Sequence, residues 1–101
     1  MARYRLTRAA ETDLDGIWWY SYETWDARQA SKYLRQLKKR IERLAEKPRL
    51  GRARDDVSPR LLSFREGRHL IFYRADRSGI TVLRVLHERM DVPERMLDDV
   101  E

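Results

Sequence analysis

A long amphipathic segment in the first half of the chain is bounded by clear signals for the start and end of a helix. Apolar residues recur at helical spacing from Ala30 to Leu44, and arginine and lysine occupy most of the positions between them. Asp26 can cap the first turn, with Gln29 three residues later, and Pro48 ends the pattern. These signals predict a helix of about 20 residues with one apolar and one basic face.

A second helical segment precedes this one and leaves almost no room for a connection. Thr7 can cap it, and its apolar stripe runs from Ala10 to Trp25. We expect this helix to end near Glu23. Because only the residues around 24–26 separate the two segments, the helices must fold back on each other as an antiparallel hairpin.

Segments with strand patterns lie on both sides of the helical hairpin. Residues 2–6 alternate between polar and apolar side chains, and three more strand-like segments follow a basic loop at residues 47–59. Gly67 and the turn at residues 76–79 separate these three at a spacing typical of β-hairpins. The predicted strands cover residues 2–6, 60–66, 68–75 and 80–87, and a short C-terminal helix is expected over residues 93–100.

The order of these elements is strand, helix, helix, three strands and a short helix, in a chain of 101 residues. This order and length predict a single α+β domain over residues 1–101, in which a helical hairpin packs on a small antiparallel sheet.

The last predicted strand is apolar on both faces. Strict alternation places Ile80, Val82 and Leu86 on one face, yet Leu83 and Val85 on the other are also apolar. One helical hairpin can shield only one face of a sheet. A partner, the C-terminal segment or the chain's own loops must therefore cover the second face.

The composition narrows the classes of function. The chain has no cysteine and two histidines, so we expect no metal site and no cofactor. It has no apolar run of the roughly 20 residues that a membrane span requires and no secretory signal, so we expect a cytoplasmic protein with no membrane partner.

Charge is distributed unevenly along the chain. Residues 28–89 carry 18 basic against 7 acidic side chains, whereas residues 1–27 and 90–101 are net acidic. Most of the basic residues are arginine, whose planar group suits carboxylates and phosphates. The pattern indicates an acidic partner, either a nucleic acid or an acidic protein segment, with a merely solvated basic surface as the alternative.

The sequence lacks the glycine-rich, HExxH and GxSxG motifs of common enzyme classes. What remains is the acid-base chemistry of a metal-free nuclease, for which the candidate catalytic residues are Arg65, Arg68, Arg84 and His87, with His69 and Tyr73 nearby. Two of these residues also have a structural interpretation. His87 can make a hydrogen bond at a strand end, and Arg84 can reach the acidic C-terminal tail. No catalytic constellation is evident from the spacing.

Several aromatic residues of the first helix cannot all face the core. Trp18, Trp19, Tyr20 and Tyr22 are too close in sequence to share one helical face. Trp19 and Tyr22 lie off the apolar stripe and are therefore candidates for contact with a partner.

Six pieces of sequence resemble the ParE toxins of bacterial toxin-antitoxin modules. They are, in chain order, YRL, AETDLDGIWWYSYETWD, KYLRQL, KPRLGR, GRHLIFYR and VLRVLHERMD. The resemblance implies a RelE/ParE-type fold and a ParD-like antitoxin as the partner in a hetero-oligomer. It also implies DNA gyrase as the target, with no direct binding of nucleic acid required and no enzymatic activity.

In the family that the chain resembles, an acidic segment of the antitoxin folds onto the toxin, and here it could settle on the open sheet face. For antitoxin binding we expect Trp19, Tyr22, Tyr33, Arg68, Leu70, Phe72, Arg84 and Leu86. The alternative is a RelE-type ribosome-dependent mRNA nuclease. Against it, the chain continues after His87 without a further tyrosine, and its acidic tail would repel RNA.

Overall fold

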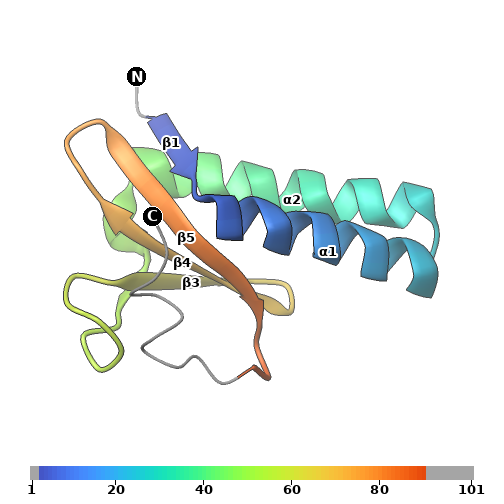
Figure 1. Cartoon of the computed structure of the whole chain (residues 1–101). Coiled ribbons are helices and arrows are strands. Elements are labelled where there is room, and N and C mark those ends of the chain that lie inside the picture. The colour runs from blue at the N-terminus through green and yellow to red at the C-terminus, as the bar shows by residue number, and fades with distance from the viewer. Residues whose placement is uncertain (1–2, 91–101) are drawn as a thin grey trace.

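The computed structural model describes residues 3–90, which form two helices and a five-stranded sheet (Figure 1). The predicted C-terminal helix lies outside the described residues. The elements are β1 (Arg3–Leu6), α1 (Arg8–Thr24), α2 (Ala27–Glu46), a 3₁₀ turn η1 (Pro48–Leu50), β2 (Arg52–Ala53), β3 (Leu62–Glu66), β4 (His69–Ala75) and β5 (Gly79–His87).

The helical hairpin forms as the capping signals predict. The side chain of Thr7 accepts a hydrogen bond from the backbone N–H of Ala10, and Asp26 accepts one from that of Gln29 at 2.8 Å. Only Trp25 and Asp26 separate the helices, which therefore run antiparallel along one face of the sheet (Figure 1). Within the described residues, no helix is long and apolar enough to cross a membrane.

The sheet is mixed, whereas the sequence predicted an antiparallel one. Its strand order is β1-β5-β4-β3-β2, and β1 pairs in parallel with β5 while every other pair is antiparallel. Two parallel strands cannot be joined by a tight turn and require a crossover connection. The helical hairpin α1–α2 is part of the connection between β1 and β5. Thr7 fixes this junction, because its hydroxyl donates to the carbonyl of Leu83 at 2.8 Å and its N–H donates to Val82.

The loop predicted at residues 47–59 contains two short elements that sequence patterns did not reveal. The strand β2 adds two residues to the sheet beside β3. The turn η1 is held by Tyr73, whose hydroxyl donates to the carbonyl of Pro48 at 2.6 Å. Both elements are too short to have a recognisable period, which is why the segment resembles a loop.

A β-bulge in β5 changes which residues face the helices. Phe72 pairs with Arg84 while the next residue, Tyr73, pairs with Val82, so Leu83 has no partner in the register. This extra residue reverses the alternation beyond it. As a result Val85 joins the core beneath the helices and Leu86 faces the other side, the reverse of the predicted assignment.

The apolar side chains accordingly form two clusters, one on each face of the sheet. The larger lies under the helices, and its fully buried members include Leu37, Ile41, Leu44, Ile71, Tyr73 and Val82. The second consists of Leu61, Phe72, Leu83 and Leu86, with Val57 and Leu70 packed against it. All four central residues are buried, so the second face does not present them as the open groove expected from the sequence.

Candidate functional site

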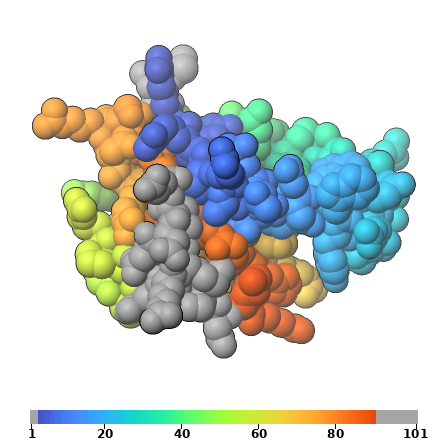
Figure 2. Space-filling model, in the orientation of Figure 1, coloured from blue at the N-terminus to red at the C-terminus, as the bar shows by residue number. Residues whose placement is uncertain are grey.

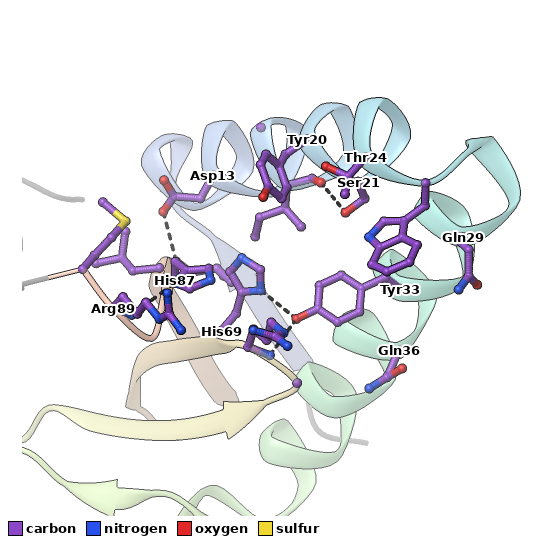
Figure 3. A pocket seen from close by; sticks show the side chains of 18 of the residues that line it. Asp13, Tyr20, Ser21, Thr24, Gln29, Tyr33, Gln36, His69, His87 and Arg89 are labelled. Atoms are coloured by element: carbon purple, nitrogen blue, oxygen red, sulfur yellow. Dashed lines mark hydrogen bonds between the residues drawn. The ribbon is translucent and has the colours of Figure 1, made fainter.

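A cleft of about 910 Å³ lies where the helical hairpin extends beyond the sheet (Figure 3). One wall is formed by α1 and the beginning of α2, and the other by the β3–β4 turn and the end of β5. Gly16 leaves space in the α1 wall, since a Cβ added there would meet no atom within 4 Å. The described part of the chain thus has a concave site of the size that commonly holds a ligand or a partner's side chains.

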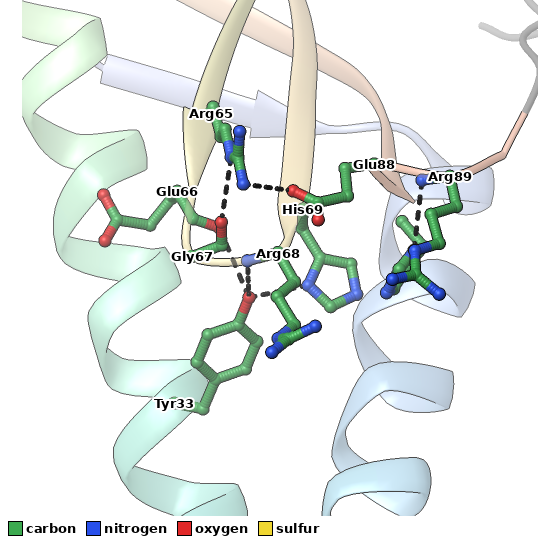
Figure 4. Close-up of polar contacts among 9 residues, drawn as sticks. Tyr33, Arg65, Glu66, Gly67, Arg68, His69, Glu88 and Arg89 are labelled. Carbon is green, nitrogen blue, oxygen red and sulfur yellow. Dashed lines mark hydrogen bonds and ion pairs between the residues drawn. The ribbon is translucent and has the colours of Figure 1, made fainter.

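A tyrosine–histidine pair forms the base of the cleft (Figures 3 and 4). The hydroxyl of Tyr33 lies 2.6 Å from Nδ1 of His69 and accepts a hydrogen bond from the N–H of Arg68 at 3.2 Å. Burial raises the pKa of Tyr33, which keeps the phenol protonated, and the same hydroxyl also lies 3.3 Å from the carbonyl oxygen of Glu66, to which it can donate. The β3–β4 turn approaches this hydroxyl at Gly67, which has a positive φ of 60°. A Cβ added to Gly67 would lie 2.6 Å from the hydroxyl oxygen of Tyr33.

His69 is held in its neutral form. Burial, with a further contribution from the positive charge that His87 can carry, lowers the pKa of His69 from 6.5 to about 4. At neutral pH the imidazole of His69 is therefore uncharged. Its ring contacts that of His87 edge to face, with centroids 5.4 Å apart, and Nδ1 of His87 accepts from the N–H of Arg89 at 3.1 Å.

We expect this histidine to make the protein less stable in mild acid. The unfolded chain binds the proton below about pH 6.5 and the folded chain only below about pH 4, so the free energy of unfolding falls as the pH decreases through this range. The loss should be about 2 to 3 kcal/mol. NMR titration of the imidazole signals, assigned with His69→Gln, tests the cause directly. A titration midpoint of His69 near pH 6.5 would contradict it.

A largely buried ion pair joins the two walls of the cleft. Arg84 on β5 donates to both carboxylate oxygens of Asp13 on α1, at 2.7 and 2.9 Å, and the N–H of Val85 donates to the same carboxylate at 3.0 Å. The hydrogen bonds between Arg84 and Asp13 raise the pKa of Arg84 above its ordinary value. The structure thus pairs Arg84 with Asp13 on the helix, whereas the sequence suggested the C-terminal tail as its partner.

The charges that line the cleft are mostly positive. Its lining includes Lys32, Arg68, Arg84 and Arg89 but, among the described residues, one acidic side chain, Asp13, which is already paired with Arg84. An anionic group in the cleft would therefore meet an excess of positive charge. Within residues 3–90, no group of three or more histidine, aspartate or glutamate side chains lies close enough together to hold a metal ion.

The four residues considered for nuclease chemistry do not all reach this site. Arg68, Arg84 and His87 line the cleft, but Arg65 does not and forms an ion pair with Glu88 instead (Figure 4). Arg84 is occupied by Asp13. The structure therefore brings three of the four together and leaves one outside.

The expected antitoxin-binding residues fall into three places. Tyr33, Arg68 and Arg84 line the cleft, and Trp19 and Tyr22 are exposed on α1, as their positions predicted. Leu70, Phe72 and Leu86 belong to the second apolar cluster, where Phe72 and Leu86 are buried and Leu70 is half-buried, and Leu86 also borders the cleft.

The aromatic residues of α1 form a second surface feature. Trp18 stacks on Tyr22 with ring centroids 5.3 Å apart, and Trp19 contacts both edge to face. Trp25, which the sequence placed on the buried stripe, is 69% exposed at the end of α1, where it lines the cleft with Tyr20. The helix therefore presents aromatic side chains to the cleft and to the outer surface.

Sequence patterns missed Asp13 as a contributor to the cleft and did not pair Tyr33 with His69. Asp13 has no nearby signal in the sequence, because its partner Arg84 is 71 residues away. The Tyr33–His69 pair joins α2 to β4 across 36 residues and has no short motif. One signal for this pair was present in the sequence. Gly67, Arg68 and His69 lie at a predicted tight turn, and polar side chains at the tip of such a turn can contact a neighbouring helix.

Comparisons with known proteins identify the class. A family model described as "ParE toxin of type II toxin-antitoxin system, parDE" matches residues 4–92. The "Toxin ParE1" of Mycobacterium tuberculosis (strain ATCC 25618 / H37Rv) is 44% identical, over 94% of this chain and 98% of that protein. The "Toxin ParE1" of Caulobacter vibrioides is 38% identical, with coverage of 90% and 94%, and the "Toxin ParE" of Escherichia coli is 36% identical, with coverage of 97% and 96%.

The fold also matches a solved structure. A chain of the "Chromosomal ParDE TA system from P. aeruginosa" aligns with a TM-score of 0.73 at 20% identity, over 86% of this chain and 96% of that chain. Fold and family model together define a toxin component of a type II toxin-antitoxin system. Within that class, the chain belongs to the ParE toxin family.

Proposed function

We propose that this toxin inhibits DNA gyrase without enzymatic chemistry and is neutralised by a ParD-like antitoxin in a hetero-oligomer. The observation that supports this proposal is the family match over residues 4–92. The match covers all the helices and strands described above, except Arg3 at the start of β1. The cationic cleft is suited to the acidic antitoxin segment that the family resemblance implies.

For the antitoxin interface, we propose direct contacts with Trp19 and Tyr22 on α1 and with Tyr33, Arg68 and Arg84 in the cleft. The aromatic residues offer apolar area to a partner, and the guanidinium groups offer hydrogen bonds to carboxylates. Leu70, Phe72 and Leu86 support this surface from the second cluster, since burial prevents Phe72 and Leu86 from offering much contact area in the free toxin.

A supercoiling assay tests the proposal. Purified toxin at saturating concentration should abolish supercoiling of relaxed plasmid by gyrase, and an equimolar amount of the antitoxin added beforehand should restore it. A bacterial topoisomerase I relaxation reaction serves as the control and should be unaffected. Unimpaired supercoiling at saturating toxin would refute gyrase as the target.

A second candidate function is cleavage of messenger RNA, and the convergence of Arg68, His69 and His87 in the cleft favours it. Imidazoles can transfer protons and guanidinium groups can stabilise a phosphorane-like charge. In a translating extract this function predicts new mRNA cuts that are lost in Arg68→Ala. Arg68 is the better test position, because changing Arg84 would also break the ion pair with Asp13. Intact mRNA would dismiss this function.

A further inference from the structure

The solvent face of α2 carries a row of basic side chains. Its members follow one another at intervals of four and three residues, so they share the helix face opposite the buried Leu37. All of them are exposed, and Figure 2 shows α2, coloured from cyan to green, at the surface along the upper edge of the molecule. This α2 basic row consists of Arg28, Lys32, Arg35 and Lys39.

The α2 basic row has no counter-charge within the described part of the protein. Over residues 3–90, none of its four side chains takes part in an ion pair, and α2 has no acidic residue before Glu42. By contrast, Arg40 on the same helix pairs with Glu66 and lies over the ring of Phe64. The contacts of Arg40 therefore give it a role within the fold, whereas the row has no such role.

The arrangement of the row is unfavourable for the helix that carries it. Arg28 and Lys32 are like charges four residues apart, as are Arg35 and Lys39, and such pairs repel each other. Arg28 also lies in the first turn, near the positive end of the helix dipole, where α2 has no acidic residue. A solvated helix face commonly mixes charges of both signs. Because rules of local stability are broken most often at functional sites, the row indicates an anionic partner.

The surroundings of the row distinguish a nucleic acid from an acidic protein. Protein interfaces are built around apolar and aromatic anchors, and among the described residues none of the exposed large apolar side chains lies on α2. Contacts with a nucleic-acid backbone need only cations that meet phosphates. From Arg28 to Lys39 the row is about 16 Å long, and one strand of duplex DNA carries about five phosphates over that axial length.

We propose that the α2 basic row binds the phosphate backbone of duplex DNA without reading its sequence. The choice of DNA rests on the proposed function, because a toxin bound to gyrase would have the DNA substrate of that enzyme beside it. The row adds a surface to those proposed for the antitoxin, since neither Arg28 nor Lys39 lines the cleft. Binding of DNA would also relieve the repulsion along α2.

The salt dependence of DNA binding tests the contact. Fluorescence anisotropy of a labelled duplex, titrated with purified toxin, should give an affinity that falls with salt at a logarithmic slope of about −3.6 for four phosphate contacts. Arg28→Ala combined with Lys39→Ala should reduce the slope to about −1.8 and weaken binding at low salt by at least about tenfold. No binding at low salt, or the native slope in this variant, would overturn the inference.

A matched variant and a second nucleic acid serve as controls. Arg52→Ala combined with Arg77→Ala removes the same two charges from exposed positions of β2 and the β4–β5 turn. This variant should keep the native slope and change affinity by less than about threefold. Equal losses in the two variants would show a response to net charge alone and would overturn the inference. Tighter binding to duplex RNA of the same length would overturn the choice of DNA.

The DNA contact and the proposed function fail in different ways. If gyrase is inhibited while the isolated toxin binds no DNA, the α2 basic row has been assigned wrongly and the target is supported. If gyrase is unimpaired while DNA binding depends on Arg28 and Lys39, the target is wrong and the DNA contact is supported.

Discussion

Replacing Asp13 with asparagine should lower the free energy of unfolding by about 3 kcal/mol. The side chains of Asp13 and Arg84 are only 12% and 17% exposed, and the carboxylate binds the guanidinium through both oxygens. Asparagine has nearly the same shape but no charge, so Arg84 would keep its largely buried positive charge without a counter-ion. The N–H of Val85 would also compete for the one remaining oxygen acceptor.

Denaturant unfolding at neutral pH measures this loss. Asp15→Asn removes the same charge from an exposed position of α1 and should change stability by less than about 0.5 kcal/mol. Adding Arg84→Met to Asp13→Asn should recover part of the loss, because no unpaired charge is then left behind. A loss in Asp13→Asn no larger than that in Asp15→Asn would show that the ion pair contributes little.

Substituting alanine for Gly79 should lower the free energy of unfolding by at least about 3 kcal/mol. Gly79 has a φ of 151°, which side chains rarely allow, and a Cβ at this position would lie 1.6 Å from the carbonyl oxygen of Arg3. That oxygen belongs to the backbone of β1 and cannot rotate away. The substitution would therefore separate β1 from β5 at the first pair of their register.

Gly16→Ala is the matched control for this substitution. Gly16 lies in the interior of α1, and an alanine Cβ there would have no atom within 4 Å, so alanine should raise the free energy of unfolding by about 0.5 to 1 kcal/mol. Thermal unfolding followed by circular dichroism separates the two cases by sign. Equal melting temperatures of the two variants would contradict the steric explanation.

The local elements of this fold could be predicted because their signals are local. Thr7 and Asp26 cap the helices through residues three positions away, and Gly67 forms the β3–β4 turn at the positive φ that only glycine adopts readily. The parallel pairing of β1 with β5 joins residues more than 70 positions apart. Nothing within β1 indicates which strand it will meet, so its orientation required the structure.

The bulge at Leu83 shows how a single residue can limit prediction. Strict alternation gave the wrong faces for Val85 and Leu86 because no glycine or proline marks the extra residue in β5. The bulge places Leu86 on the same face as Leu70 and Phe72, where Leu86 is buried. Arg84 has many acidic residues within the sequence as potential partners, and only the fold selects Asp13.

The position of β5 has a consequence for the synthesis of this toxin. It lies between β1 and β4, although among the strands of residues 3–90 it is the last to be translated. A nascent chain that has emerged from the ribosome only as far as β4 has neither the partner of its first strand nor the carbonyl that anchors Thr7. A chain truncated before β5 would therefore lack the strand that joins β1 to β4 and could not form this sheet.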